Sequence, residues 1–375
     1  MRIETFQMER MQSTWENVVE FDLSESGVYP VSLRELMGMG FDLDWALDTP
    51  LSYSQSNGTP ELRRALAEIY PGASIDQIEI TNGTSEANYM LPLSLLGEGD
   101  NFALEVPNYM QLWGVPRSLG ARVDRFRLRS EAGWEPDWEE FELAVNPGTR
   151  LVYVSNPNNP TGATLTVPAM ERIVRRCEEM DAYLIADEVY LGAEIHRDRT
   201  PSFWGMSDRV IVTSGLSKAF GIPGVRIGWM VGPENIIRDC WTQHDSLTIC
   251  PNKLSDAVAL TAVQPDNREQ LYSRGRGLLQ RNLEIMQGWV EGLGEGFEFS
   301  PPDAGAMCFI KYPGEVPSVE LCEQIRDRQS VLIVPGTHLG MEGYIRVWMG
   351  AQPDYLRAGL QRLERELRVA LSLPA

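Results

Sequence analysis

SGLSKAFGIPGVRIGW, residues 214–229, contains Lys218, one of only three lysines among the 33 lysines and arginines of the chain. Elsewhere the sequence supplies positive charge almost entirely with arginine. Arginine stays protonated at any pH that a folded protein survives, whereas a desolvated lysine amine can lose its proton and attack a carbonyl carbon. Lys218 is therefore either a Schiff-base lysine or a surface amine that lies along an apolar wall. The surrounding motifs decide between these two roles.

The segments around this stretch alternate between short apolar runs and a helical pattern. Apolar runs over 151–156, 182–190, 209–215 and 226–232 predict strands, and residues 167–180 carry an apolar stripe at helical spacing. Short apolar strands separated by helices are typical of a mostly parallel sheet that is buried on both faces. The sequence therefore predicts an α/β fold.

The pattern changes after about residue 265, where a long helix over 267–293 is followed by short strands and further helices. This α+β texture predicts a second, smaller domain, which we expect the first 45 residues to join. The predicted division is a large domain over residues 46–265 and a small domain formed by 1–45 and 266–375.

Composition argues against several classes of function. The net charge of −20 disfavours nucleic acid, whose binding rests on neutralising phosphates. The sequence has no run of about 18 apolar residues, and its first residues lack the apolar core of a secretory signal, so we expect a cytoplasmic protein with no membrane partner. Five dispersed cysteines indicate free thiols, and three histidines without a Cys/His cluster predict no protein metal site.

Three predicted strands end in the polar residues Asn156, Asp187 and Ser214, and ligands of open α/β sheets bind outside the carboxyl ends of the strands. An acid at the end of a buried strand is costly without a cationic partner, and a protonated pyridine nitrogen is such a partner. Tyr190 follows Asp187 by three residues and can present its phenol to the same ligand. The alternative is that Asp187 caps a following helix.

The turn SNPNNPTG, residues 155–162, is rigid and displays Asn159 as a hydrogen-bond donor, although a plain Asx/Pro turn would carry the same residues. Arg226 follows Lys218 by eight residues across two glycines, and its guanidinium suits a phosphate dianion.

The segment ITNGTSEANYML, residues 80–91, reads as a strand, a turn at Gly83 and a helix start. Amides and hydroxyls of Thr84 and Ser85 at a helix N-terminus form an anion site. Together the motifs describe a ligand with an aldehyde, a ring nitrogen that needs an anion, a ring hydroxyl that needs donors, and a phosphate. Pyridoxal 5′-phosphate (PLP) has all four groups, so the sequence predicts this cofactor.

The motifs NPNNPTG, ADEVY and SGLSKAFGIPGVRIG, in this order and spacing, resemble those of the fold-type I PLP enzymes, and specifically of the class I and II aminotransferases. The resemblance spans nearly the whole chain. It implies the fold of the PLP-dependent transferases, with a mostly parallel seven-stranded sheet in the large domain and a smaller α+β domain. It also implies a homodimer with shared active sites, because family members reach the phosphate of the neighbouring subunit with a tyrosine, here Tyr53.

The resemblance also implies roles for individual residues. Lys218 is similar to the lysine that binds the cofactor and shuttles protons, and Asp187 is similar to the partner of the ring nitrogen; with Tyr190 they form the predicted catalytic set. Tyr109 is similar to the aromatic that stacks on the ring. The implied cofactor-binding set is Gly83, Thr84, Ser85, Tyr109, Asn159, Asp187, Tyr190, Ser214, Ser217, Lys218, Arg226 and Tyr53.

For the substrate, the resemblance implies that Arg346 clamps the α-carboxylate, the alternative being a surface arginine on an edge strand. Ser26 and Gly27, in LSESGV, would close over the substrate together with Asn159. Arg117, Arg197 and Arg199 are candidates to bind a distal carboxylate.

The chain departs from the family pattern at two places. Gly215 stands where many relatives carry a phosphate-binding serine, which leaves Ser214 or Ser217 to supply that hydroxyl. His338 stands where relatives often carry a bulky apolar residue near the substrate mouth, and it is a candidate specificity residue.

Two functions share every cofactor residue. The first is an aminotransferase that exchanges the amino group between an α-amino acid and a 2-oxo acid. The second is a PLP-dependent lyase, cyclase or oxidase of a specialised amino acid, because LSESGV, HDSLTICPNKLSDAVA and VLIVPG resemble the capreomycidine synthase branch, which cyclises a guanidino amino acid. A ligand-sensing regulator would need a DNA-binding module, and the chain lacks both the length and a basic patch for one.

Overall fold

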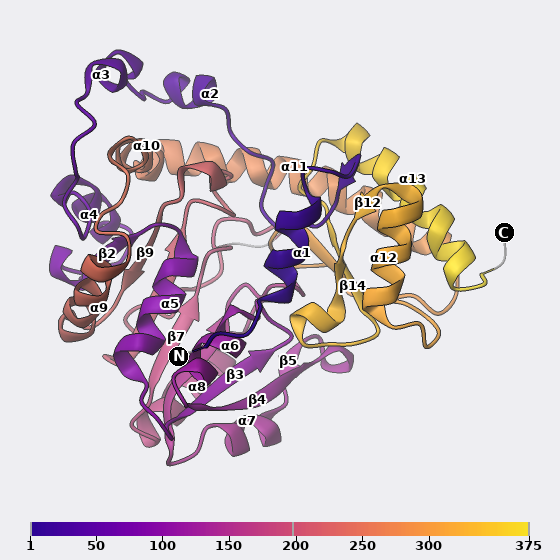
Figure 1. The fold of residues 1–375 in the computed structure, drawn as a ribbon, viewed down its shortest axis with the longest axis horizontal. Helices are drawn as coiled ribbons and strands as arrows, with labels where there is room; N and C mark the ends of the chain where they lie inside the picture. The colour runs from indigo at the N-terminus through magenta and orange to yellow at the C-terminus, as the bar shows by residue number, and fades with distance from the viewer. Residues whose placement is uncertain (1, 197–198, 374–375) are drawn as a thin grey trace.

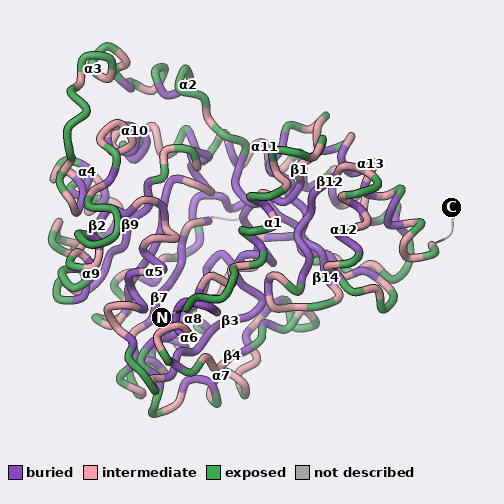
Figure 2. The backbone as a smooth tube through the Cα atoms, viewed as in Figure 1, coloured by how far each residue is buried: buried purple, intermediate pink, exposed green. Residues whose placement is uncertain are grey.

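The computed structural model describes residues 2–196 and 199–373. A large sheet covered by helices forms one part of the molecule, and the C-terminal elements, orange to yellow in Figure 1, form the other. The N-terminal helix α1 (Gln7–Trp15) lies between them. Figure 2 shows that the buried backbone runs through both parts, whereas the segment of α2 (Leu33–Gly38) and α3 (Leu43–Asp48) stands out as largely exposed.

The described residues form a large sheet of eight strands. Five neighbouring strands, from β8 to β4, are parallel, and β9 is antiparallel to both of its neighbours. The predicted seven strands become eight because the two-residue β5 pairs with the edge strand β4, and a strand that short leaves no periodic pattern in a sequence. In spatial order the strands are β2 (Ile78–Thr81), β9 (Gly228–Val231), β8 (Val210–Gly215), β7 (Tyr183–Asp187), β6 (Thr149–Ser155), β3 (Asn101–Val106), β4 (Arg122–Arg129) and β5 (Glu135–Pro136).

Helices cover both faces of this sheet, which explains its continuous apolar runs. Leu151 and Tyr153 of β6 pack with α5, α6 and α9, whereas Val152 and Val154 belong to the core that also contains α7 and α8. Successive side chains of a strand point to opposite faces, so a strand buried on both sides is apolar at every position. The bounds are α5 (Thr84–Leu95), α6 (Gln111–Ser118), α7 (Trp138–Ala144), α8 (Val167–Glu179) and α9 (Glu234–Leu247).

The second part contains a four-stranded sheet of order β10-β11-β14-β13 and a two-stranded pairing of β1 with β12. The run VLIVPG, predicted as one strand, is divided: Val331 and Leu332 pair with β1, and Val334 and Pro335 pair with β14. The N-terminal β1 therefore joins this part through backbone hydrogen bonds. The strands are β1 (Phe21–Asp22), β10 (Glu298–Phe299), β11 (Met307–Lys311), β12 (Val331–Leu332), β13 (Val334–Pro335) and β14 (Tyr344–Trp348).

The remaining helices are α4 (Pro60–Ala67), α10 (Lys253–Val263), α11 (Pro265–Leu293), α12 (Ser318–Gln329) and α13 (Pro353–Ala370). None of the helices in the described ranges combines the length and the apolar composition that a bilayer crossing needs. The four strands expected over 151–156, 182–190, 209–215 and 226–232, the helix over 167–180 and the long helix after residue 265 are confirmed, and all five cysteines are free. The residue limits of the two domains stay a prediction.

A buried histidine joins α9 to the sheet and to α5. His244 Nδ1 lies 2.9 Å from Glu79 Oε1, and His244 Nε2 lies 3.7 Å from Glu86 Oε2. Burial by itself lowers the pKa of His244, but the hydrogen bond to Glu79 and the charge of Glu86 outweigh it, so the pKa is raised above its usual value. Because Glu86 also accepts a hydrogen bond from the Asn82 amide at 2.6 Å, the cluster holds the turn at which α5 begins.

We expect His244→Gln to lower the free energy of unfolding by about 3 kcal/mol at about pH 6, because it leaves a buried carboxylate unpaired. A histidine whose pKa is raised by folding stabilises the folded state fully below its unfolded pKa, and this contribution is lost as the pH rises through the folded pKa. In urea titrations, the stability difference from wild type should therefore shrink as the pH rises from about 6.5, the ordinary histidine value, through the raised pKa of His244. The control His196→Gln, at an exposed position, should change little. A difference that stays constant would contradict the prediction.

Candidate active site

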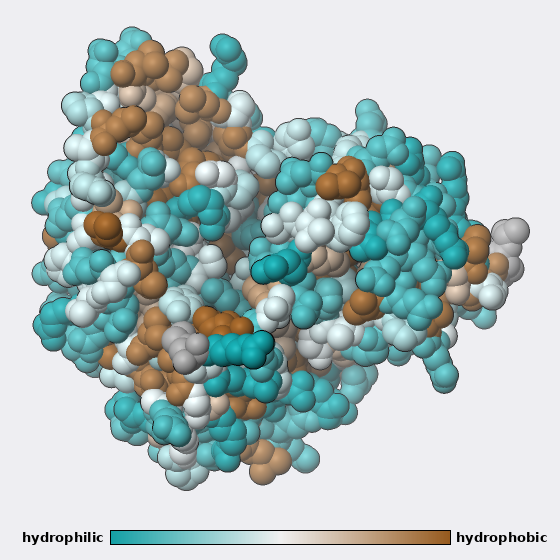
Figure 3. All heavy atoms as spheres, viewed as in Figure 1, coloured by the Kyte–Doolittle hydropathy of each residue, from teal (hydrophilic) through white to brown (hydrophobic). Residues whose placement is uncertain are grey.

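A cavity of about 350 Å³ lies at the carboxyl ends of β6, β7 and β8, between the large sheet, β14 and α1. The space-filling view in Figure 3 shows the surface hollowed between the two parts of the molecule. The prediction that a ligand site lies beyond these strand ends agrees with this position. The sequence-predicted residues that line the cavity are Ser26, Thr84, Ser85, Tyr109, Asn159, Asp187, Tyr190, Ser217, Lys218, Arg226 and Arg346.

Lys218 lies in the turn that follows β8, with its Nζ atom 3.4 Å from Glu25 Oε2. Burial by itself would lower the pKa of the Lys218 amine, but the electrostatic interaction with Glu25, followed by that with Tyr190, outweighs it and raises the pKa above its usual value. Lys218 therefore lines a cavity instead of lying along an exposed apolar wall. In the free protein its amine is an ammonium held by a carboxylate.

Asp187 ends β7 with only 6% of its surface exposed. Burial raises the pKa of its carboxyl, although it accepts hydrogen bonds from Tyr153 Oη at 2.9 Å, Asn88 Nδ2 at 3.3 Å and the Val189 amide at 3.1 Å. No helix is present between β7 and β8 in the described residues, so the alternative role as a helix cap is wrong. A cationic group in the cavity would stabilise this buried carboxylate in its charged form.

Sequence reasoning missed Asn88 and Tyr153. Asn88 lies on a face of α5 that otherwise buries Ala87, Met90 and Leu91, and a polar residue on an apolar helix face was the available signal. Tyr153 gave no signal, because a tyrosine within LVYVS reads as an ordinary core residue of a strand. Only the pairing of β6 with β7 brings its hydroxyl to Asp187.

Arg346 is 1% exposed and lies on β14, an inner strand flanked by β11 and β13. The alternative of a surface arginine on an edge strand is therefore wrong. Its Nη1 donates to Asn159 Oδ1 at 2.9 Å and its Nη2 donates to the Ser24 carbonyl at 2.5 Å. Within the described residues, Arg346 Nε and Tyr190 Oη are buried without a hydrogen-bond partner. A ligand with acceptor groups would satisfy both.

At the other end of the cavity, Thr84 and Ser85 begin α5, and Arg226 donates from Nη1 to Ser217 Oγ at 3.4 Å. Gly83 has φ +87°, and a Cβ on it would lie 2.2 Å from Arg226 Nη2. Glycine at this position therefore allows the guanidinium to lie against the amides that begin α5. Such a group of donors suits a phosphate dianion.

Of the two candidate hydroxyls near the absent serine, that of Ser217 belongs to a residue that lines the cavity. A Cβ on Gly215 would lie 2.7 Å from Thr84 Oγ1 and 3.0 Å from the Ile227 carbonyl, which leaves no room for a serine side chain. Ser214 does not line the cavity, because its Oγ donates to the Glu188 carbonyl at 3.4 Å and borders a second cavity.

Several predicted residues do not line this cavity. Tyr53 is 82% exposed, and Gly27 lies behind Lys218, where a Cβ would be 2.9 Å from the Ser217 carbonyl. His338 lines a separate cavity beside the N-terminal segment, so it does not stand at the mouth of this cavity. Among the three arginines considered for a distal carboxylate, Arg117 pairs with Glu4, Arg199 lies over the Tyr272 ring, and Arg197 is outside the described residues.

The N-terminal segment supplies cavity residues that sequence reasoning missed, chiefly the carboxylates of Glu9, Glu16 and Glu25. Glu9 Oε1 accepts a hydrogen bond from Tyr109 Oη at 2.7 Å. Burial, together with repulsion from Asp22, Glu25 and Glu9, raises the pKa of Glu16. The spacing of Glu9 and Glu16, seven residues apart on one face of a helix, was the available sequence signal.

A family model described as aminotransferase class I and II matches residues 47–363. The chain belongs to the class I and II aminotransferase family. It is 28% identical to capreomycidine synthase of Streptomyces vinaceus over 356 residues, which cover 92% of this chain and 89% of the relative. It superposes on a PLP-dependent aminotransferase of Streptococcus suis 89-1591 with a TM-score of 0.91 and 30% identity, covering 98% and 99% of the two chains. For the PLP-dependent cyclase OrfR the TM-score is 0.88 with 27% identity, covering 99% and 98%.

The cofactor of this aminotransferase-family enzyme is PLP, and the cavity fits it. The buried carboxylate of Asp187 suits a protonated ring nitrogen, and the unpartnered Tyr190 hydroxyl suits the ring hydroxyl. The donors around Arg226 suit the phosphate, and Lys218 is the one lysine that lines the described cavity.

We expect Gly83→Ala to weaken PLP binding about tenfold or more, because the new Cβ displaces the Arg226 guanidinium. Arg226 then loses its proposed charge-assisted hydrogen bond to the phosphate. Gly99→Ala is the matched control: it has the same φ of +87° but no atom within 4 Å of the place its Cβ would take, so it shares only the backbone strain. Titration of each apoprotein with PLP measures the difference. Equal affinities of the two variants for PLP would contradict the prediction that Arg226 and the residues at the start of α5 bind the phosphate.

Proposed function

We propose that the protein is a PLP-dependent aminotransferase that exchanges the amino group between an α-amino acid and a 2-oxo acid. One observation carries the proposal: Lys218, Asp187 and Arg346 line a single cavity, together with Tyr190. One site therefore contains a lysine that can bind the cofactor covalently, a carboxylate that can keep its ring protonated, and an arginine that can bind a substrate carboxylate. The family membership and the likeness to a PLP-dependent aminotransferase support this function.

PLP supplies an aldehyde that links to amines and a pyridinium ring that accepts electrons. We propose that Asp187 holds the ring nitrogen, Tyr190 and Asn159 hold the ring hydroxyl, and Tyr109 covers the ring face. The phosphate would be held by the amides and hydroxyls at the start of α5 together with the side chains that face them, namely Gly83, Thr84, Ser85, Ser217 and Arg226. Ser214 would support this end only through the backbone, since its carbonyl accepts from Thr84 Oγ1 at 2.9 Å.

On the substrate side, Arg346 is preset for a carboxylate. Two of its nitrogens are fixed by Asn159 and Ser24, and Nε is left to donate to the α-carboxylate. Binding of the α-carboxylate would orient the substrate α-carbon toward Lys218. The neutral amine of Lys218 removes the α-proton and returns it to the carbon that was the cofactor aldehyde. Ser26 lines the cavity at the edge of this region, with Gly27 behind it.

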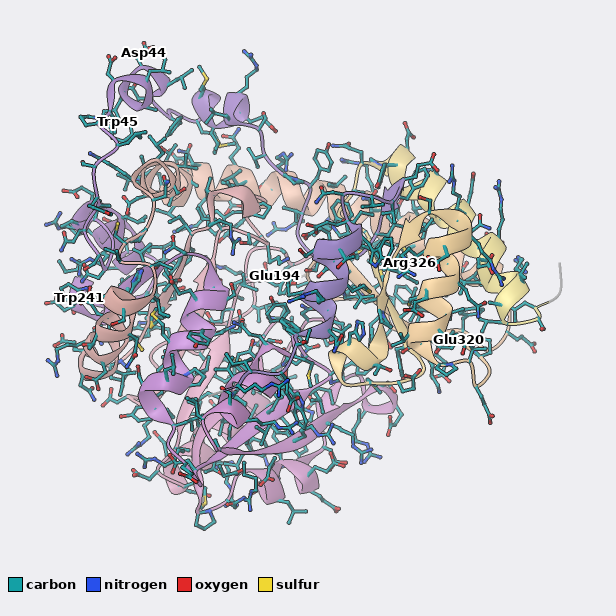
Figure 4. All side chains as sticks on the ribbon, viewed as in Figure 1. Asp44, Trp45, Glu194, Trp241, Glu320 and Arg326 are labelled. Atoms are coloured by element: carbon teal, nitrogen blue, oxygen red, sulfur yellow. The ribbon has the colours of Figure 1, made fainter. Side chains whose placement is uncertain are left out.

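We infer that the protein works as a homodimer. The exposed apolar side chains of the α2 and α3 segment gather at one corner of the molecule, where Figure 3 shows a hydrophobic patch, and Trp45 projects from α3 in Figure 4. Tyr53 lies at the end of this segment with 82% of its surface exposed. A second copy of the chain would cover the patch and would receive the Tyr53 hydroxyl at its phosphate end. The patch is formed by Leu33, Met37, Trp45, Leu47 and Leu51.

A second candidate function is that of a PLP-dependent lyase, cyclase or oxidase of a guanidino amino acid. Capreomycidine synthase and the cyclase OrfR are similar to this chain along most of their lengths. One observation favours a cationic substrate. Glu9 and Glu16 form an acidic wall of the cavity, and within the described residues neither carboxylate has a cationic partner, because Lys218 pairs with Glu25. Such a wall disfavours a dicarboxylic amino acid and suits a guanidinium.

Transamination and cyclisation differ in their requirement for a 2-oxo acid. We expect the purified holoenzyme, mixed with an amino acid alone, to accumulate pyridoxamine phosphate if it is an aminotransferase. Ammonia or a cyclic product formed without an oxo acid would instead support the second candidate. The assay distinguishes them because both functions use the same cofactor residues.

We expect borohydride reduction of the holoenzyme, followed by mass analysis of its peptides, to place the cofactor adduct on Lys218. Lys218→Ala should lose both the adduct and the yellow absorbance, because the other two lysines lie outside the cavity. Lys311→Ala, which removes an amine paired with Glu298 on the surface, should retain both. An adduct on another lysine would contradict the proposed function.

We expect Glu9→Gln and Glu16→Gln to raise the KM for arginine about tenfold each, since each removes a charged partner worth about 1.5 kcal/mol. The KM for leucine should change little, because leucine has no cation to lose. Glu4→Gln, which removes a surface partner of Arg117 on the same N-terminal segment, is the control. Equal changes for arginine and leucine would mean that these carboxylates do not bind a distal cation.

A further inference from the structure

Glu25 is the described acidic residue that lies within ion-pair distance of the Lys218 amine, with 3.4 Å between Oε2 and Nζ. It follows β1 in the loop 23–27 and is held by its own neighbours. Its Oε2 accepts hydrogen bonds from the Ser26 amide at 3.0 Å and from the Gly27 amide at 3.4 Å. The carboxylate is therefore fixed against the amine by the backbone of its own loop.

The loop itself is tied to both parts of the molecule. The Ser24 carbonyl accepts from Arg346 Nη2, and the Gly27 carbonyl accepts from Trp348 Nε1 at 2.6 Å. The Val28 amide donates to the Lys218 carbonyl at 3.2 Å. The backbone on both sides of Glu25 is therefore held against β14 and against the turn that contains Lys218.

The other titratable groups that interact with Lys218 are Asp187 of β7, Tyr190, Arg346 of β14 and Glu9 of α1. Asp187 is occupied by three donors, and Glu9 by the Tyr109 hydroxyl. Glu25 is the carboxylate placed to exchange a proton with Nζ.

We propose that Glu25 is a second proton-transfer residue of the active site, which accepts a proton from the α-ammonium group of the substrate and passes it to Lys218. The inference rests on the proposed function only in taking an amino acid as substrate. One N–H bond of the ammonium breaks and one O–H bond forms on Glu25, leaving a neutral substrate amine. The O–H bond breaks, as an N–H bond forms at Nζ, only after Lys218 has returned the α-proton to carbon, so the amine stays neutral while it acts as the base. No electrons are gained or lost.

The charge of Glu25 is suited to this exchange because its largest electrostatic partner changes during turnover. While Lys218 is an ammonium, its charge holds the pKa of Glu25 at about 2. When the lysine is bound to the cofactor this charge is absent, and burial then favours the protonated carboxyl. The same group is therefore a weaker base beside the free ammonium and a stronger base when a substrate enters.

The three lysines of the chain allow a direct test. Apoprotein labelled with ¹³C at lysine Cε should give three resonances, one for each of Lys218, Lys253 and Lys311, assigned by Lys→Arg variants. In Glu25→Gln, we expect the Lys218 resonance to titrate at a pH lower by about one pKa unit or more, since an opposite charge has been removed. Glu298→Gln is the matched control: it removes the partner of Lys311 and should move only that resonance.

A Lys218 titration that is unchanged in Glu25→Gln would overturn the proposal. This measurement uses no cofactor and no reaction, so it fails independently of the proposed function, which the borohydride adduct tests. Should the glutamine variant not fold, Glu25→Asp should lower the Lys218 titration by a smaller amount, and no change in a folded Glu25→Asp protein would equally contradict the ion pair.

The pH dependence of kcat/KM tests the transfer itself. Without Glu25 the enzyme must use substrate whose amine is already neutral, so kcat/KM of Glu25→Gln should rise about tenfold per pH unit up to about pH 9, near the pKa of the substrate amine. Wild type should level off at lower pH, and Glu25→Asp should restore the wild-type shape. A purely structural role would lower kcat/KM without changing its pH profile, and that outcome would overturn the proposal.

Discussion

The buried carboxylate of Asp187 is the constraint on which the rest of the site depends. A charge at the end of a central strand is stable only if donors surround it, and β6, α5 and the turn after β7 each supply one. These three donors leave the carboxylate facing the cavity, where a protonated ring nitrogen would complete its environment. The parallel order of the strands matters here, because the carboxyl ends of β6, β7 and β8 reach the same edge of the sheet.

The N-terminal segment supplies acidic side chains to the cavity. Strand β1 pairs with β12, so the loop after it reaches both Arg346 and Lys218, and helix α1 lies over the cavity. The residues proposed to hold the cofactor come from the strands of the large sheet and the segments that follow them, whereas Glu9, Glu16 and Glu25 come from the N-terminal segment.

The hydrogen bonds of Arg346 connect these two sets of residues. Its guanidinium bonds to Asn159 from the large part and to Ser24 from the N-terminal loop, while its Nε is buried without a hydrogen-bond partner in the described residues. A substrate carboxylate bound there would contact a residue that already holds the two parts together. Under the proposed function, binding of substrate would therefore be coupled to the position of the N-terminal loop through one buried side chain.

Sequence alone determined the α/β class, the positions of the main strands and helices, and most residues around the cavity, because these depend on local apolar patterns and on motifs with short spacing. Lys218, Asp187, Asn159 and Arg226 could be found in this way. The sequence could not show that Tyr153 and Asn88 donate to Asp187 or that Gly215 has no room for a side chain. It also could not show that Glu9, Glu16 and Glu25 line the cavity. Those features arise from strand register and from contacts between residues up to hundreds of positions apart, which only the tertiary structure decides.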